Sequence, residues 1–404
     1  MFRTLLGITF TKKACTGEQR LKKLFLQKPW WMWVFPVLTL SFLIAIPLFV
    51  WNATDAILKS TDGDFGDVVV DPSEAGYLTY VTATPSHLTF AVDDDGNLAM
   101  VAVIALGPND AGGSLLLLKP ETVLGQENTI ASIYASEGPD ETERSLKAYL
   151  NIGFTTSNTM FASNWDSYLA PVSPLSVDLK IPSYEIAVSE ISAVDGSRCC
   201  QYEGDIELRS GGVGQFIADS SDDVSGELRR IRQQVFWTTW IEALAIEGDA
   251  PLIPGEVESG FGRMVSGLSQ GDLVIVELPQ GQNPEETHIE KAAARDAVLN
   301  MIPFPLPSSP GSRATVRLLD GVGGLDLAAV YSPSLVKAGA QILIMGNSSE
   351  FNGRTELIYH DEKNAELAEL FKQALGGGEI FFEPLTDAAV EITVIIGDEL
   401  KDRN

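Results

Sequence analysis

The sequence predicts an α/β protein with one N-terminal membrane helix and two folded domains beyond it. Two observations support this prediction. An uncharged apolar segment follows a short basic stretch, and the rest of the 404-residue chain alternates strand-like with helix-like patterns on both sides of a proline-rich stretch, 303–312. Strands that alternate with helices are typical of α/β domains. We expect the domains at 67–304 and 313–400, joined by an extended linker at 305–312.

The N-terminal part predicts one membrane crossing. Residues 1–29 carry seven basic residues and one acid, a charge of +6; the other 21 basic and 54 acidic residues of the chain sum to −33. Residues 30–51 have no charge and, at about 1.5 Å per residue, reach about 33 Å as a helix. The positive-inside rule then places 1–29 in the cytoplasm and everything after a linker, 52–66, outside the plasma membrane. A buried core helix or a cleaved signal peptide are the alternatives.

Cysteine, histidine and charge exclude several classes of protein. Three Cys and three His provide no disulfide framework and no recognisable metal-site spacing, so we predict no structural metal. The net charge of −27 argues against nucleic-acid binding. Cys199 and Cys200 are adjacent on the predicted outer side. A vicinal disulfide, two free thiols and pairing between molecules all remain open for them.

The first domain shows five strand patterns before and after its helices. GYLTYV (76–81) precedes a hairpin made of SHLTFAV (86–92), an Asp-rich turn and LAMVAVIAL (98–106), whose unbroken apolar run indicates burial on both faces. The turn acids Asp93, Asp94 and Asp95 are interpreted as solvated. A short strand at 114–118 and a buried strand at 272–278 complete the set.

Three helices are predicted in the first domain, at 141–150, 225–244 and 290–300. The longest is capped by Ser225, and we expect one apolar side to be buried. That side consists of Leu228, Ile231, Val235, Trp237 and Trp240.

The pattern restarts after the prolines. We predict strands at 314–319, 341–345, 355–359 and 391–396, and helices at 325–338 and 363–375. Pro333 should break the first of these helices, because proline removes a backbone donor.

Several motifs resemble known envelope families. Three segments of the C-terminal part are similar to a LytR C-terminal-type domain. They are DGVGG (320–324), GNSSEFNGRTELIYHDEKNAELAELFKQALGGGEI (346–380) and VEITVIIGDEL (390–400). The first domain resembles the LytR–CpsA–Psr (LCP) family more loosely, over about residues 67–306. The resemblance rests on LRRIRQQVF (228–236) and on DLVIVELPQG (272–281), which is followed by a helix that ends in IPFP. LCP enzymes transfer a glycopolymer from a polyprenyl pyrophosphate carrier to peptidoglycan.

The resemblance implies a phosphate site but also points to its loss. Arg229 and Arg232 match two phosphate-facing arginines of the LCP family, three residues apart on one helix face. The alternative is that Arg229, Arg230 and Arg232 form a solvated basic face. Asp110 is interpreted as a remnant of a site acid. Asn109 stands in place of the first pocket arginine, and Ala218 and Ser220 stand in place of an Arg-x-Arg pair. TATPSH (82–87), where an early acid is expected, has none.

We therefore predict no catalytic residue, and a weak lipid-phosphate site at Arg229, Arg232 and Asp110. The first hypothesis is a membrane-anchored, non-catalytic envelope protein that binds a lipid-linked glycopolymer, peptidoglycan or another wall component, or a partner protein such as an active LCP relative. The second is a divergent glycopolymer phosphotransferase, which would need Mg²⁺; otherwise no cofactor is expected. The third is a purely structural tethered interaction module.

Overall fold

The computed structural model describes residues 69–125, 128–179, 204–219, 226–247, 253, 258–278, 289–385 and 389–401. They belong to one compact unit that begins at Val69. The predicted tail, membrane segment and linker lie outside the described residues, as do Ser225 and the two adjacent cysteines. Within the described ranges, no helix combines the length and apolar character needed to cross a bilayer.

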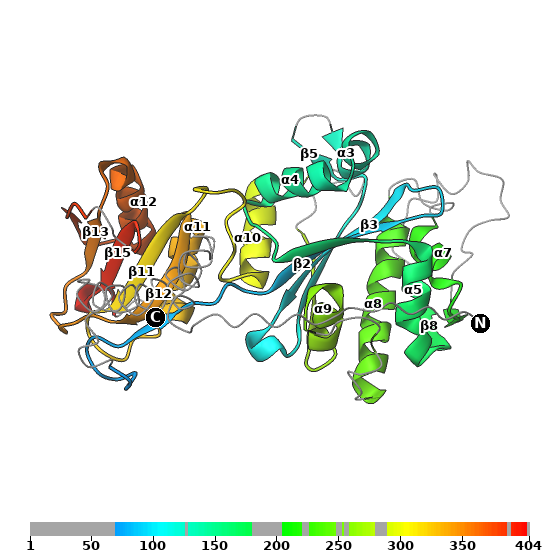
Figure 1. The fold of residues 1–404 in the computed structure, drawn as a ribbon, viewed down its shortest axis with the longest axis horizontal. Helices are drawn as coiled ribbons and strands as arrows, with labels where there is room; N and C mark the ends of the chain where they lie inside the picture. The colour runs from blue at the N-terminus through cyan, green and yellow to red at the C-terminus, as the bar shows by residue number, and fades with distance from the viewer. Residues whose placement is uncertain are drawn as a thin grey trace, which may run out of the picture. The chain divides into compact units, whose positions relative to one another are not determined.

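The first domain is built on a five-stranded sheet in the order β10-β4-β3-β2-β7 (Figure 1). Its strands are β2 (Ser86–Val92), β3 (Leu98–Leu106), β4 (Gly113–Leu118), β7 (Thr156–Met160) and β10 (Leu273–Val276). The predicted hairpin is confirmed: β2 and β3 are antiparallel, with Phe90 opposite Val101. All of β3 is buried, as its continuous apolar run predicts.

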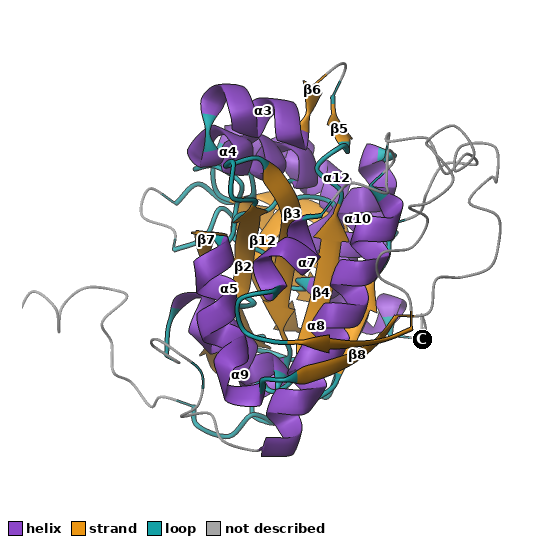
Figure 2. Cartoon of the chain, turned by 90° about the vertical axis from the view of Figure 1, so that its right-hand side faces the viewer, coloured by secondary structure: helices purple, strands orange, loops and turns teal. Residues whose placement is uncertain are grey.

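Helices cover both faces of this sheet, as Figure 2 shows for the side that carries α8. They are α3 (Ile130–Glu137), α4 (Pro139–Leu150), α5 (Ala162–Leu169), α7 (Val213–Ala218), α8 (Glu227–Glu247), α9 (Gly260–Leu268) and α10 (Lys291–Met301). One apolar core lies between the sheet and α5, α7, α8 and α9, and a second lies between the sheet and α3, α4 and α10. The predicted α/β class is thereby confirmed for the described part.

Short elements complete the domain. They are the 3₁₀ turns η1 (Pro108–Asp110) and η2 (Ala170–Val172), the ribbon of β5 (Val123–Leu124) with β6 (Asn128–Thr129), and the ribbon of β8 (Leu175–Leu179) with β9 (Gly204–Leu208). The Asp-rich turn lies between β2 and β3, where Asp93 Oδ1 accepts a hydrogen bond from the Asn97 amide at 2.7 Å. Asp94 and Asp95 are exposed, so the solvated interpretation of this turn is confirmed.

The prediction that 272–278 is a buried strand is wrong. β10 lies at the edge of the sheet and pairs in parallel with β4 alone. None of its residues is buried, and Val274 is 54% exposed. A short apolar run cannot distinguish a central strand from an edge strand, because its hydrophobicity does not report how many neighbours it has.

A buried histidine lies on β2. His87 is 1% exposed; its Nδ1 lies 2.7 Å from Thr156 Oγ1 and its Nε2 lies 3.0 Å from Asn158 Oδ1. An amide oxygen only accepts, so Nε2 carries the hydrogen of a neutral imidazole. Burial lowers the pKa of His87 below its ordinary 6.5, although Asn158 and the charge of Glu143 oppose the change.

We expect His87 to make the stability of the fold depend on pH. Because its folded-state pKa lies below the unfolded value, its contribution is complete above about pH 6.5 and decreases as the pH falls through the folded-state pKa. The free energy of unfolding, measured by denaturant titration between pH 7.5 and 5.0, should decrease with pH in the wild type. The decrease should be shallower in His87→Gln. If the free energy of unfolding changes equally with pH in the two proteins, His87 is not the source of the pH dependence.

The second domain is a six-stranded sheet in the order β1-β12-β11-β15-β13-β14. Its strands are β1 (Leu78–Tyr80), β11 (Ala314–Asp320), β12 (Ala340–Asn347), β13 (Glu356–Tyr359), β14 (Glu379–Phe382) and β15 (Ile392–Ile396). One face packs on the π-helical turn η4 (Leu327–Tyr331), α11 (Ser332–Lys337) and α12 (Ala365–Leu375), around Leu318, Phe371 and Val394. The 3₁₀ turns η5 (Glu362–Asn364) and η6 (Asp398–Leu400) complete it.

The predicted strands and helices of this domain are confirmed, and one further strand, β14, joins them. The helical segment 325–338 divides as expected: η4 ends at Tyr331, and Pro333 lies in the first turn of α11. Proline is tolerated there because the first turn of a helix has no intrahelical acceptor for its amide.

The first strand of the described chain pairs with the second domain. β1 lies antiparallel to β12, with Leu78 opposite Gly346. A Cβ atom on Gly346 would lie 1.9 Å from Tyr77 O, so only glycine permits this approach. Residues 78–80, which the sequence analysis places in the range 67–304, thus complete the sheet of the C-terminal part.

The proline-rich stretch is not a free spacer, and that interpretation is wrong. Phe304 O accepts a hydrogen bond from the Thr84 amide at 2.9 Å, and Leu306 O accepts one from the Gly153 amide at 2.7 Å. Prolines remove donors but leave every carbonyl available. Extended backbone that alternates proline with apolar residues can therefore still dock against the first domain.

Candidate functional site

Arg229 and Arg232 lie in the first turns of α8 and are each 5% exposed. The alternative of a solvated basic surface is therefore wrong for both. The predicted apolar side of α8 is only partly right: Trp237 and Trp240 are buried, but Leu228, Ile231 and Val235 are half-buried. The helix turns its arginines inward because each finds acceptors within the chain.

Arg229 forms an ion pair with Glu121, which follows β4. Its Nη2 donates to Glu121 Oε1 at 2.5 Å, and the Glu121 side chain is 33% exposed. The turn that precedes α8 is shaped around this pair. Gly226 has φ +72°, and a Cβ atom there would lie 2.4 Å from Glu121 Oε2. Gly226 is thus favoured by its backbone conformation, and a larger residue would also displace the end of the Glu121 side chain.

Arg232 holds the C-terminal end of α7. Its Nε donates to Phe216 O at 2.6 Å and its Nη2 donates to Asp219 O. The guanidinium carbon lies 5.6 Å from the centroid of the Phe216 ring, within the range of a cation–π interaction. These contacts satisfy carbonyls at the end of a helix, where a positive charge is favourable.

The neighbouring residues extend this network. Gln233 Nε2 donates to Ala99 O at 3.0 Å and to Ile217 O at 2.8 Å, joining α8 to β3 and α7. Arg230 Nη2 pairs with Glu227 at 2.7 Å, and Lys119 Nζ lies 3.5 Å from the same carboxylate. Burial raises the pKa of Glu227, but these two cations lower it more, so it lies below its ordinary value. The cations of α8 are thus matched by acceptors of this chain.

Asp110 does not lie with the two arginines. It is in η1, just before β4 begins at Gly113, whereas Glu121 follows the other end of β4. At about 3.3 Å per residue, the six-residue strand separates them by about 17 Å. The Asp110 carboxylate accepts hydrogen bonds from Arg263 on α9, at 3.0 Å from Nε and 2.6 Å from Nη2.

The loop that carries Asp110 has an unusual backbone. Asn109 and Asp110 both have positive φ, 60° and 58°, a region that costs energy for residues other than glycine. Of the other positions where the resemblance expects arginines, Ala218 ends α7, and Ser220 lies outside the described residues.

An aromatic cluster fills the core behind α8. Trp165 of α5 lies with its ring centroid 5.9 Å from those of Phe236 and Trp237, 6.0 Å from Phe261 and 6.1 Å from Trp240. The three tryptophans are buried, and no described residue accepts a hydrogen bond from their indole nitrogens. Edge-to-face packing at these distances is the favoured geometry of aromatic pairs.

The described residues provide no cluster of three or more potential metal-ligating side chains. Sequence reasoning identified the arginines of α8 but missed Glu121 and Arg263, the residues that neutralise Arg229 and Asp110. These partners are 108 and 153 residues away along the chain. No local pattern marks such pairs, because they are formed only by the tertiary fold.

Comparisons with solved structures find several proteins that align with about half of the chain. The Listeria innocua protein Lin1025 is 12% identical, covering 55% of this chain and 97% of its own, with a TM-score of 0.35. Bacillus subtilis TagV is 15% identical, covering 55% and 96%, with a TM-score of 0.39. The LytR-CPS2A-psr family protein YwtF (TagT) of B. subtilis, with bound octaprenyl pyrophosphate, is 11% identical, covering 57% and 90%, with a TM-score of 0.38.

None of the curated proteins compared with the chain matches it. A family match covers the C-terminal part: residues 313–399 match LytR_C, described as "LytR cell envelope-related transcriptional attenuator". The matched range spans β11 to η6, the helices that pack on the sheet and the loops between them. It also includes the motif DGVGG and all but the last residue of VEITVIIGDEL. Residues 313–399 of this chain are therefore a domain of the LytR_C family.

Proposed function

We propose that this chain is a membrane-anchored envelope protein whose first domain is a non-catalytic relative of the LCP enzymes. One observation carries the proposal: Arg229 and Arg232, which resemble the phosphate-facing arginines, are buried and bonded to Glu121, Phe216 O and Asp219 O. The LytR_C domain, whose family is described as cell envelope-related, supports the location.

The chemistry of pyrophosphate favours the non-catalytic alternative. Two linked phosphates need several charge-assisted donors that face the developing charge. Arg229 could turn to such a ligand only by leaving Glu121, and separating this partly exposed ion pair costs about 2–4 kcal/mol. Asn109 and Ala218 add no positive charge. The transferase alternative would therefore lack the electrostatic stabilisation that such a reaction requires.

The described residues do not fit the Mg²⁺ that the family resemblance implies. Magnesium sites in proteins use carboxylates that keep their negative charge available to the ion. Asp110 is the acid that best matches the resemblance, and its Oδ2 already accepts two hydrogen bonds from Arg263. We derive no catalytic step through a metal.

The proposed topology places residues 1–29 in the cytoplasm and the two domains outside the plasma membrane. It rests on the +6 charge of the tail against −33 for the remainder. In intact cells, a membrane-impermeant thiol reagent should leave Cys15 unlabelled, whereas Cys199 and Cys200 should react after mild unfolding. Labelling of Cys15 in sealed cells would reverse the orientation.

The proposed ligand of the first domain is the phosphate of a lipid-linked glycopolymer. We expect binding of a short-chain polyprenyl phosphate to be weak, salt-sensitive and indifferent to Mg²⁺, because the arginines are already partly neutralised. Calorimetric titration of the detergent-solubilised chain at two salt concentrations measures this. Arg229→Lys and Arg232→Lys keep the charge but lose the planar fork, and should weaken binding more than the control Lys147→Ala. Equal affinities in all variants would leave the first domain with a structural role.

A further inference from the structure

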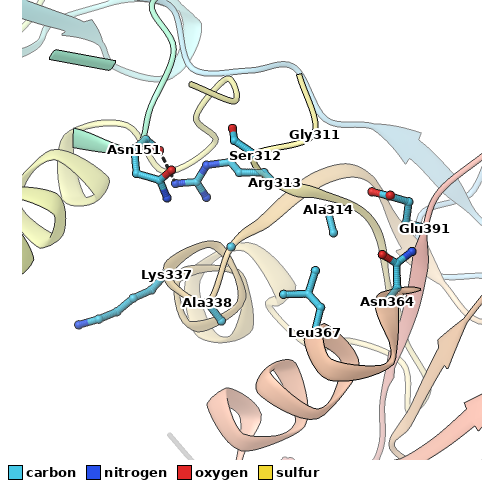
Figure 3. A pocket seen from close by; sticks show the side chains of 11 residues that line it. Asn151, Gly311, Ser312, Arg313, Ala314, Lys337, Ala338, Asn364, Leu367 and Glu391 are labelled. Atoms are coloured by element: carbon cyan, nitrogen blue, oxygen red, sulfur yellow. Dashed lines mark hydrogen bonds between the residues drawn. The ribbon is translucent and has the colours of Figure 1, made fainter. Parts of the chain in front are cut away.

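The sheet of the LytR_C domain ends in an edge strand, β14, on the side away from the first domain. β14 is the last strand of the order β1-β12-β11-β15-β13-β14 and pairs in parallel with β13 alone. The first domain contacts other strands of this sheet. Arg313, just before β11, donates from Nη2 to Asn151 O at 2.9 Å (Figure 3) and from Nη1 to Ala340 O, where β12 begins, at 3.2 Å. At about 4.8 Å between neighbouring strands, β14 lies about 19 Å from β12.

The backbone of β14 turns hydrogen-bonding groups toward this edge. The amides of Glu379 and Glu383 donate to carbonyls of the segment 355–359 at 2.9 and 3.1 Å, which shows that these residues bond to the β13 side. Backbone groups of successive residues in a strand point in opposite directions. The N–H and C=O groups of Ile380 and Phe382 therefore face away from β13, and no described residue bonds to them. Such a row of groups is a template for an added strand.

The side chains at this edge are apolar and exposed. Phe381 is 43% exposed, Phe382 is 44% exposed, and Leu385, just beyond the strand, is 50% exposed. The Phe382 ring stacks on Tyr359 of β13, with 5.0 Å between the ring centroids, and this contact holds it in place. Exposed apolar patches with a polar rim are typical of interaction sites.

Acidic side chains flank Phe381 on its face of the sheet. The register places Glu379 directly opposite Glu356 of β13, and the alternation of a strand places Glu383 on the same face. None of these three carboxylates forms an ion pair with another described residue. Like charges directly opposite each other on a sheet are unfavourable. A cation that arrives at this edge would relieve the repulsion.

The same charges disfavour a second copy of this chain as the occupant of the edge. In the antiparallel register centred on Phe381, Glu379 of each copy would lie opposite Glu383 of the other, and like charges would meet twice. The chain as a whole also has a net charge of −27. The occupant that fits is an extended segment of another protein, with apolar residues between two cations that are four residues apart.

We propose that β14 is the docking edge for such a basic, apolar segment of a partner protein, which adds one strand to the six-stranded LytR_C sheet. Apolar side chains of the segment would pack on Ile380 and Phe382 on one face. Its two cations would meet Glu379 and Glu383 on the other face. The inference goes beyond the proposed function, which concerns the first domain.

The test is a fluorescence-anisotropy titration of the detergent-solubilised full chain against a labelled peptide, Ser-Lys-Val-Tyr-Val-Lys-Ser. We expect saturable binding, and none over the same range when glutamate replaces both lysines of the peptide. The double variant Glu379→Lys, Glu383→Lys should bind the lysine peptide at least about fivefold more weakly and should bind the glutamate peptide instead, because each cross-strand charge pair changes sign. The matched control reverses two exposed acids of the first domain, Asp94→Lys and Glu137→Lys, and should bind as the wild type does.

Two substitutions at one position test the backbone. Phe382→Ala removes the ring, whereas Phe382→Pro also removes the outward N–H, and proline is tolerated at an edge position whose amide faces solvent. The proline variant should bind the lysine peptide more weakly than the alanine variant does. The proposal is wrong if the lysine peptide does not saturate, if these two variants bind it equally, or if the charge control loses as much affinity as the Glu379/Glu383 variant. Self-association of the chain that Phe382→Pro abolishes would assign the edge to a second copy and would also overturn the proposal.

Discussion

Trp165→Ala should destabilise the chain by about 3–5 kcal/mol, the usual cost of removing a large buried aromatic side chain. Trp165 is 1% exposed and lies within about 6 Å, between ring centroids, of four other aromatic rings. Removing it leaves a void that α5, α8 and α9 cannot all close, since α8 and α9 contact the sheet and α5 packs against α7.

The measurement is a denaturant titration followed by circular dichroism. Trp165→Phe keeps an aromatic ring and should lose less stability, because the indole nitrogen has no described partner to forfeit. The matched control is Phe161→Ala, immediately before α5, where the side chain is 56% exposed; it should change stability little. A loss in Trp165→Ala no greater than in Phe161→Ala would mean that the aromatic cluster is not the core of this layer.

Glu121→Gln should destabilise the first domain by about 2–4 kcal/mol. The change removes the negative charge of the carboxylate that accepts from the Arg229 guanidinium, which is almost fully buried. We place the expected loss somewhat below the full cost of breaking a buried pair, because Glu121 is one-third exposed. The free energy of unfolding from a denaturant titration measures it, and Glu137→Gln at the exposed end of α3 is the control.

A second substitution separates the two roles that Arg229 could have. If the loss arises because the buried charge of Arg229 is less well compensated, Arg229→Met in the Glu121→Gln background should recover part of the stability, since no charge then remains to be buried. Further destabilisation in the double variant would show that Arg229 has other partners that outweigh Glu121.

The sequence predicts much of the architecture because local patterns carry it. The Asp-Gly turn between two β-rich runs indicates the β2–β3 hairpin, and Pro333 locates the break between η4 and α11. The LytR_C motifs identify the C-terminal domain independently of the structure. In each case, the information lies within a few residues.

The features that the sequence does not predict depend on residues that are distant along the chain. The buried side of α8 includes Arg229 and Gln233 because their acceptors, Glu121 and Ala99 O, are brought to them by the fold. Hydrophobic periodicity favours Leu228 and Ile231 instead, since it treats every arginine as solvated. Likewise, the pairing of β1 with β12 spans more than 260 residues, and the docking of the proline-rich stretch rests on carbonyls that any residue has.

We propose that the arginines of α8 stabilise the fold and do not support catalysis. The most direct test incubates the purified full chain with a polyprenyl-pyrophosphate-linked glycan, Mg²⁺ and peptidoglycan, and measures both transfer and phosphate release. We predict neither above a control without protein, because Asn109 and Ala218 supply no charge and Arg229 and Arg232 are bonded within the chain. Turnover well above that control, abolished in Arg232→Lys while the variant remains folded, would contradict the account.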